Sequence, residues 1–497
     1  MYQRKRYWPF RVVGANALAF VFLYLTSASL VEGQTTVFHG GVLIDGTGSA
    51  PVRDAVIVVR DSIVVCAGPR ATCSSYLERD AVTLVDLSGT WIIPGLIDVH
   101  VHLTSPCCQV ASPPESRLLA LLQAGVTTVR DVGAWVDTMQ SATRYALGHG
   151  QVELMAAMVE RVRRESTPGP RIRYCGPGLY SSDNVQRYPR YPNYIRLRSG
   201  ADIGGVIGYL VDRGATCIKL YSGAKPQDME AVLAAAAARG VPGIGHSSTD
   251  VPLAIQLAWQ WAEIHHTWFS AEDLLTPERR ARLPRSQDAR LFVGWALFDP
   301  ATPEAAALAA QVAQRRIAWV PTLAVTALDE YPMSYWDMIR AGAGPTDSAL
   351  VRQALFDPAR PLVAAADSAE ALRAASLRFA MQWVGLLHDA GVTILAGSDS
   401  PQRPGGQGLD PGAGLHAELE YLVTAGLSPM EALAAATRNA AAALGLSDRL
   451  GTVSAGKLAD FVVLRADPLQ DIRNTRRIRF VVFGGAVIGV ESHVPGR

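Results

Sequence analysis

Eight short segments rich in β-branched and apolar residues recur along the middle of the chain, and several of them are followed by a helical pattern. The first is Ile92–Leu103, the last is Gly391–Asp399, and Asp228–Gly240 is typical of the Ala- and Leu-rich helices between them. Eight strand–helix units of this kind predict an α/β fold, a (β/α)₈ TIM barrel. Segments 270–315 and 329–360 are too long for ordinary connections and indicate insertions at the barrel mouth.

The segments that flank this region read differently. Residues 34–90 and 448–497 alternate in short β-type runs separated by Gly, Asp and Pro turns. A few isolated strands cannot bury a face alone, so we expect the two ends to combine in a small β-sandwich domain. The predicted organisation is a sandwich part at 34–90, the barrel at 91–447 and a second sandwich part at 448–497.

Residues 1–33 have the pattern of an export signal. Basic residues, from Arg4 to Arg11, precede an apolar run from Val12 to Leu30. This pattern predicts a cleaved signal peptide, with an uncleaved N-terminal anchor as the alternative. We therefore expect an exported protein, periplasmic or secreted, that meets a membrane only if the segment is retained.

The composition of the chain limits the kinds of binding partner that we expect. The chain has 497 residues and a net charge of +1, which gives no electrostatic reason to expect a nucleic acid partner. A small-molecule substrate is expected, and a homo-oligomer is compatible with the sequence. Six cysteines are too few to be the main scaffold, although Cys66 and Cys73 could form a short-loop disulfide. Cys107 and Cys108 lack a CxxC spacing, so an inert role is favoured over metal binding.

Polar residues that can bind a metal lie near the carboxyl ends of the expected strands. His100 and His102 are two apart on one strand, so their side chains share a face. Lys219, His246, the pair His265 and His266, and Asp399 lie near the ends of later strands. Barrel enzymes assemble their sites at this face, and imidazole and carboxylate groups are typical metal ligands.

This ordered set resembles the metal-dependent amidohydrolase superfamily, and more closely its imidazolonepropionase-like and prolidase-like (Xaa-Pro dipeptidase-like) branch. The resemblance also includes PGLIDVHVHL, GVTTVRDVG, GLHAELEYLVTAGLSPMEALAAAT and GTVSAGKLADFVVL. It implies two divalent metal ions, with Zn²⁺ expected. By resemblance, one ion is bound by His100, His102 and Asp399, the other by His246 and His266, and both by Lys219 carrying a carbamate (N6-carboxylysine).

The chemistry of each residue agrees with these roles. Burial disfavours the charged form of Lys219, and a neutral amine can add CO₂ to become an anionic ligand, although a paired core lysine is the alternative. Asp399 could instead cap a helix. Two metals would lower the pKa of a bridging water. The resulting hydroxide would attack a carbonyl, with Asp399 accepting its proton.

The remaining candidates are weaker. Relatives usually carry Ile-Glu-His where this chain has Ile264-His265-His266, so His266 is the expected ligand and His265 is expected to face the helices. His416 is expected to assist catalysis or contact substrate, with a surface position as the alternative. Tyr221 shares a face with Lys219 and could contact substrate or simply pack. Arg130 and Asp131 are expected to form a polar pair inside the barrel.

The expected function is hydrolysis of an amide-type C–N bond by a metal-bridged hydroxide. The resemblance favours a dipeptide (Xaa-Pro-like) or an N-acyl amino acid as substrate. A cyclic amide, an imidazolone or a lactone is the alternative substrate class. The alternative that is not an enzyme is a binding protein that has the same barrel but no catalytic activity.

Overall fold

The computed structural model describes residues 35–78, 82–103, 114–133, 149–164, 168–181, 195–198, 200–221, 223–283, 287–328, 368–400 and 410–489. The expected export segment and the pair Cys107 and Cys108 lie outside these residues. Within them, none of the helices combines the length and the apolar character needed to cross a bilayer.

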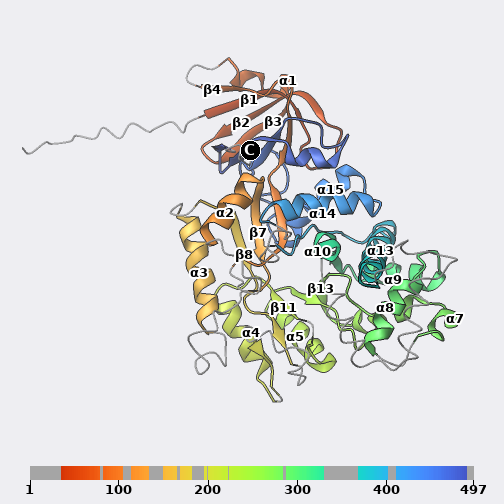
Figure 1. The fold of residues 1–497 in the computed structure, drawn as a ribbon. Helices are drawn as coiled ribbons and strands as arrows, with labels where there is room; N and C mark the ends of the chain where they lie inside the picture. Colours follow the sequence, from red (N-terminus) through yellow and green to blue (C-terminus); the bar gives the residue numbers. More distant parts are fainter. Residues whose placement is uncertain are drawn as a thin grey trace, which may run out of the picture.

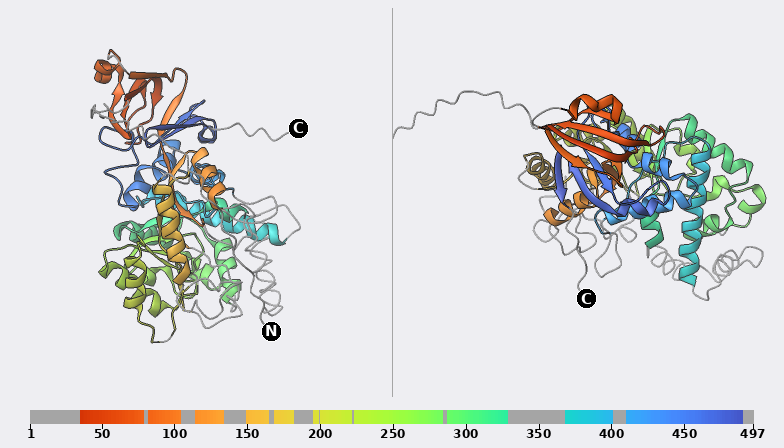
Figure 2. Two further views of the ribbon diagram at one scale, coloured as in Figure 1. Left: turned by 90° about the vertical axis from the view of Figure 1, so that its left-hand side faces the viewer. Right: turned by 90° about the horizontal axis from the view of Figure 1, so that it is seen from above.

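Strands from both ends of the chain form one sheet, drawn in red-orange and dark blue in Figures 1 and 2. Its order is β17-β16-β15-β5-β1-β2-β3, with β4 pairing parallel to β1. Strand β15 pairs antiparallel with β5, and Val462 lies opposite Ile93. The eight strands are β1 (Thr35–Leu43), β2 (Val52–Arg60), β3 (Ile63–Pro69), β4 (Val82–Asp86), β5 (Trp91–Pro94), β15 (Phe461–Leu464), β16 (Ile478–Phe483) and β17 (Ala486–Gly489).

Strands from the two ends of the chain pair in one continuous hydrogen-bonded sheet. It also includes β5, so it extends to Pro94, beyond the predicted boundary at residue 90. Phe38 of β1 packs edge-on against Phe461 of β15 with ring centroids 5.1 Å apart, so the two ends of the chain share a hydrophobic core.

Parallel strands form the middle of the molecule. The three-stranded sheet has the order β6-β7-β8, and the six-stranded sheet has the order β10-β9-β11-β12-β13-β14. Seven of the eight expected segments contain one of these strands, namely β6 (Leu96–Val101), β7 (Val126–Asp131), β8 (Arg171–Tyr174), β11 (Ile218–Leu220), β12 (Gly243–His246), β13 (Trp261–His265) and β14 (Ala318–Val320). The short β9 (Leu179–Tyr180) and β10 (Ile195–Arg196) extend the second sheet.

The eighth expected segment connects the two parallel sheets. Ile394 forms a parallel bridge with Trp319, next to β14, and Ser400 forms one with Val101 at the end of β6. On the other side, the backbone N–H of Thr216 donates to the carbonyl of Tyr174, and a disulfide joins Cys175 to Cys217. The arrangement is consistent with the predicted TIM barrel.

Helices surround these strands (Figure 1). The helices α4 (Ile203–Asp212) and α5 (Pro226–Ala238) lie near β11, and the side chain of Asp202 caps α4 by accepting from Gly205 N–H. The predicted insertion at 270–315 is largely helical, with α7 (Pro277–Arg280), α8 (Gln287–Leu297) and α9 (Pro303–Gln314). These last two pack against α13 (Ser368–Asp389).

Two disulfides join described cysteines. The predicted short-loop pair Cys66–Cys73 is confirmed, and it ties β3 to the short helix α1 (Arg70–Cys73). The second bond, Cys175–Cys217, was not predicted, because its partners are 42 residues apart in the sequence.

Candidate active site

The first half of the site is built on β6. All residues of this strand are buried, and His102, which directly follows it, lies on the same side as His100. Nε2 of His100 lies 3.3 Å from Oδ1 of Asp399, and Nε2 of His102 lies 3.0 Å from the same oxygen. The three residues offer ligand atoms that all lie within 4.8 Å of one another.

Hydrogen bonds behind these ligands fix their orientation. Nδ1 of His102 lies 3.0 Å from the carbonyl oxygen of Gly133, which leaves Nε2 directed at Asp399. Asp98 accepts from the backbone N–H of His100 and from both the N–H and the hydroxyl of Ser398, at distances of 3.1, 3.0 and 2.5 Å. Asp98 thus joins β6 to the segment that carries Asp399.

The second half of the site comes from the six-stranded sheet. Lys219, His246 and His266 are buried, and the rings of His246 and His266 lie 4.3 Å apart between centroids. The ring of His266 is also 4.8 Å from that of His100, and its Nδ1 is 3.9 Å from Oδ2 of Asp399. The structure therefore gathers all six predicted metal ligands into one cluster.

The prediction for His265 is wrong. Its Nδ1 lies 2.8 Å from Nδ1 of His100 and 3.3 Å from Nζ of Lys219, so it faces the cluster and not the helices. His265 is the last residue of β13 and follows the strand alternation, whereas His266 has a φ of 64°. The chain leaves the strand at this point, and the left-handed turn directs both neighbouring imidazoles inward.

Arg130 and Asp131 are both buried but do not form the predicted pair. The guanidinium of Arg130 binds both carboxylate oxygens of Glu263 and donates to the carbonyl of Val99. Asp131 instead accepts from the backbone N–H groups of Leu103 and Gly133. Adjacent residues of a strand point to opposite faces, which explains why each finds a separate partner.

Burial controls the protonation of the cluster. It lowers the pKa of His100, His246 and His266 well below the usual value, so these rings are neutral and can bind a metal. Burial also lowers the pKa of Lys219 to about 7, although the nearby Asp399 opposes this shift. Burial would raise the pKa of Asp399, but contacts with His100 and His102 hold it well below its ordinary value.

Aromatic side chains border the cluster. The ring of Tyr221 lies 4.5 Å from that of His246, so this candidate substrate residue is close to the site. Trp268 stacks on His266 with ring centroids 4.2 Å apart and an interplanar angle of 4°. Thr322 places its hydroxyl 2.7 Å from Nδ1 of His266. The sequence alone did not identify Trp268, Thr322, Asp98 or Glu263 as residues of the site. Strand alternation could have identified Asp98 and Glu263, whereas no local pattern marks Trp268 or Thr322.

The structure does not bring His416 into this cluster. It lies in the first turn of α14 (Ala413–Thr424), and its Nδ1 is 2.9 Å from the hydroxyl of Thr475. Its Nε2 is 3.0 Å from the carbonyl oxygen of Ala124. Both ring nitrogens are thus engaged in contacts that hold α14 against its neighbours.

The donor set fits a divalent cation. Nε2 of His100 is buried, and among the described residues its nearest polar neighbour is the carboxylate of Asp399 at 3.3 Å, a long contact that a metal ion between the two groups would replace. Neutral imidazoles and a carboxylate are the ligands that Zn²⁺ and similar ions prefer. His100, His102 and Asp399 could therefore hold one ion, with Lys219, His246 and His266 beside it.

Parallel strands with a buried cluster of His, Lys and Asp near their carboxyl ends have the layout of an enzyme site in an α/β protein. The amidohydrolase family profile matches residues 91–267 and 369–488, and the chain belongs to this family.

Individual relatives agree with this assignment. Ochratoxinase from Aspergillus niger is 24% identical over 487 residues, which cover 90% of this chain and 85% of the ochratoxinase. Imidazolonepropionase from Methylobacterium nodulans is 45% identical over 56 residues, or 11% of this chain and 13% of that enzyme.

Solved structures share the fold. A Xaa-Pro dipeptidase crystallised with methionine in its active site is 17% identical, with a TM-score of 0.62 over 92% of this chain and all of the other. Molinate hydrolase is 19% identical, with a TM-score of 0.63 over 94% of this chain and 97% of the other.

Proposed function

We propose that this amidohydrolase depends on divalent metal and hydrolyses the amide bond of a dipeptide, Xaa-Pro-like, or of an N-acyl amino acid. The observation that carries the proposal is the buried cluster of His100, His102, Lys219, His246, His266 and Asp399 on a core consistent with a TIM barrel. The substrate class is supported by similarity to a Xaa-Pro dipeptidase and to ochratoxinase.

The cluster divides into two sets of ligands. His100, His102 and Asp399 would hold one ion, His246 and His266 the other, and a carboxylated Lys219 would serve both. Lys219 is suited to this role because its buried amine has a pKa of about 7 and is partly neutral. The neutral amine attacks CO₂, a proton is released, and the resulting carbamate carries the negative charge. When bound, the ions supply Lewis acidity that polarises an amide carbonyl and lowers the pKa of water.

The residues of the chain would then handle protons and substrate. Asp399, which is ionised, accepts a proton from the attacking water and returns it to the leaving nitrogen. Tyr221 and Trp268 border His246 and His266, so they would contact the substrate and limit access of bulk water. A buried chain of contacts runs from Arg130 to Glu263, from Glu263 to His265 and from His265 to Lys219. This chain would orient the side chain of Lys219.

Metal analysis of the purified protein tests this assignment. We expect about two divalent ions per chain, and loss of one or both in His100→Ala and His266→Ala because each removes a ligand. Hydrolysis should fall by more than about 100-fold in both variants. His265→Ala serves as the neighbouring control and should retain more metal than His266→Ala. The opposite order would make His265 the ligand.

A substrate panel separates the candidate activities. Xaa-Pro dipeptides and N-acyl amino acids should be cleaved, with activity lost after chelation and restored by Zn²⁺. Cyclic amides and imidazolones belong in the panel because the imidazolonepropionase match favours them as the second candidate. Lactones are the last class of compound in the panel. Binding of these compounds without turnover, in a protein with full metal content, would instead support the silent binding protein.

We also propose that the protein is exported and that residues 1–33 are removed. Two disulfides among the described cysteines support this, because such bonds persist in oxidising compartments. Cell fractionation and N-terminal sequencing test it: the mature chain should begin near Gln34 outside the cytoplasm. Full-length protein in the membrane fraction would mean an anchor, and full-length soluble cytoplasmic protein would contradict export.

A further inference from the structure

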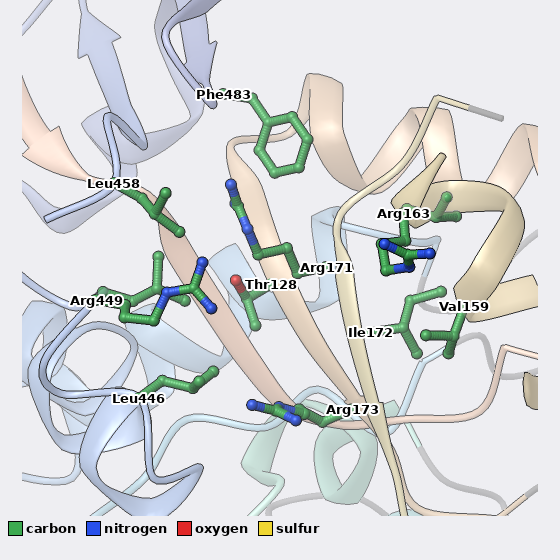
Figure 3. Close-up of a pocket in the computed structure, with 12 residues that line it drawn as sticks. Thr128, Val159, Arg163, Arg171, Ile172, Arg173, Leu446, Arg449, Leu458 and Phe483 are labelled. Atoms are coloured by element: carbon green, nitrogen blue, oxygen red, sulfur yellow. The ribbon is translucent and has the colours of Figure 1, made fainter. Parts of the chain in front are cut away.

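A cavity lies beside β7 and β8, and Figure 3 shows the side chains that line it. Its volume is about 400 Å³. Thr128 of β7 and Arg171 and Arg173 of β8 contribute to its lining, and Arg171 is the first residue of its strand. The helix α3 (His149–Arg163), the segment after α16 (Arg438–Ala443) and Phe483 of β16 complete it. The cavity therefore lies where the parallel strands meet the terminal sheet.

The lining is rich in positive charge. Arg163, Arg171, Arg173 and Arg449 all border the cavity. Among the described residues, Glu160 pairs with Arg163, and Asp460 pairs with Arg171 and is also attracted by Arg449, so two carboxylates compensate part of the charge of four arginines. Arg171 is also held 4.4 Å from the ring centroid of Phe483, which restricts its guanidinium. A guanidinium carries five N–H donors, so pairing with one carboxylate leaves it able to bind a second anion.

A buried hydroxyl provides an independent sign of a ligand. Thr128 is 0% exposed, and its Oγ1 has no hydrogen-bond partner. Figure 3 shows this hydroxyl at the centre of the view, with Arg171, Arg173 and Arg449 drawn around it. An unsatisfied buried hydroxyl costs free energy, and an oxygen atom of a ligand in the cavity would remove that cost.

The rest of the lining is apolar. Val159, Ile172, Leu446 and Leu458 are among the side chains that form it, in addition to the ring of Phe483. A cavity of this size with apolar walls and a few convergent polar groups has the character of a small-molecule site. We propose that it binds a small organic anion, with a carboxylate or phosphate head on the arginines and Thr128 and an apolar body against these walls.

The two head groups can be distinguished by calorimetry on the full protein as purified. The probes are 4-bromobenzoate and 4-bromophenyl phosphate, with 4-bromobenzyl alcohol as the neutral counterpart. At least one anion should bind with one-to-one stoichiometry and at least tenfold more tightly than the alcohol, and the tighter anion identifies the head group. The bromine gives an anomalous signal in a crystal, which should lie among Thr128, Arg173 and Arg449.

Variants link binding to the cavity. Arg173→Gln combined with Arg449→Gln should weaken binding at least tenfold, and Thr128→Val should weaken it while preserving the shape of the side chain. Arg60→Gln, an exposed position at the end of β2, is the matched control and should bind as the unmodified protein does. Val162→Glu keeps all four arginines but adds a carboxylate to the wall, and it should also weaken binding.

Three results would overturn the proposal. The first is unchanged affinity in the double arginine variant or in Val162→Glu, with the melting temperature of each variant showing that it is folded. The second is a bromine signal confined to the metal cluster, and the third is anions that bind no better than the alcohol. Metal content and hydrolysis do not enter these measurements, so the result is independent of the proposed catalytic function.

Discussion

At the scale of single residues, two ligands owe their positions to unusual backbone conformations. His266 has a φ of 64° and Asp399 a φ of 55°. Each such conformation costs an L-residue roughly 1–2 kcal/mol, and it is found where surrounding structure or function requires it. His266 directly follows the last residue of β13, and Asp399 directly precedes Ser400, which forms a bridge with Val101.

Replacement of Lys219 tests the anionic bridge. Lys219→Ala should lose metal and more than about 100-fold of the activity, because no negative charge remains between the two ligand sets. Acetate or formate should restore part of both, since a short carboxylate can place its oxygens in the space left by the side chain. Activity assays and metal analysis with and without the acid check this.

Lys219→Arg is the matched variant. The guanidinium group of arginine carries a permanent positive charge that repels cations, and the group does not accept CO₂. We expect little rescue of this variant by short acids. An added carboxyl mass on Lys219 of the unmodified protein would support the carbamate, and a well-ordered unmodified lysine beside one fully occupied metal would exclude it.

The sequence predicted most of the cluster because strand alternation and strand ends can be seen in a sequence. It placed His100, Lys219 and His246 on buried strand positions, where the structure has them, and His102 lies buried just beyond the end of β6. It failed at His265, because the left-handed turn at His266 breaks the two-residue period and no local pattern signals it. The Arg130–Glu263 pair joins strands of two different sheets across 133 residues of sequence, and such contacts depend on how the finished fold arranges its strands.

At the scale of secondary-structure elements, β11 leaves no room for a side chain at Gly245 of the neighbouring β12. This glycine has a φ of 133°, and a Cβ atom there would lie 2.1 Å from the carbonyl oxygen of Leu220. The tight approach places the neighbouring His246 beside the strand that carries Lys219.

Gly245→Ala should therefore push the two strands apart. We expect a loss of about 2–4 kcal/mol in the free energy of unfolding, from backbone strain and overpacking. Metal content should fall with it, because His246 moves. Denaturant unfolding and metal analysis check this. Gly294→Ala in α8 is the control: its Cβ would meet Ala271 at 3.5 Å, an ordinary contact, so stability should be unchanged or higher.

Helix α14 gives a prediction for pH. Burial lowers the pKa of His416 to about 4 from 6.5, so between these values the unfolded chain binds a proton that the folded chain does not. The free energy of unfolding should therefore fall as the pH drops from 6.5 to about 4, by roughly 2–3 kcal/mol from this group. His416→Gln should have a shallower decline. Parallel pH titrations of stability in both proteins check this, and equal slopes would contradict it.

The role of His416 also shows where prediction from the sequence ended. Its motif is shared with relatives and was interpreted as part of the site, but its partners, Ala124 and Thr475, lie 292 and 59 residues away. A helix start is visible in a sequence, whereas the surface against which that helix packs is not. The pairing of the two chain ends was easier to predict, because short strands need a partner wherever they occur.

At the scale of the whole molecule, the bond between Cys175 and Cys217 joins the end of the three-stranded sheet to the start of β11 in the six-stranded sheet. It closes a loop whose ends are 42 residues apart. Cross-links of this length stabilise mainly by restricting the unfolded chain.

Removal of this bond should be costly. Cys175→Ser with Cys217→Ser should lower the free energy of unfolding by about 2–4 kcal/mol. The matched double variant, Cys66→Ser with Cys73→Ser, should lose less of the free energy of unfolding. The disulfide that it removes joins residues only seven positions apart. Denaturant unfolding of the two double variants compares them directly, and a larger loss in the short-loop pair would contradict the argument.

The pairing of β5 with β15 also has a consequence for how the protein is made. Trp91 and Phe461 begin strands that are neighbours in space but about 370 residues apart along the chain. At about 5–20 residues per second, a ribosome needs roughly 20–70 s to travel that distance. During this interval β5 has an open edge, which is a site for aggregation. A chaperone that covers this edge during synthesis would improve the yield of folded protein more than one that acts after release.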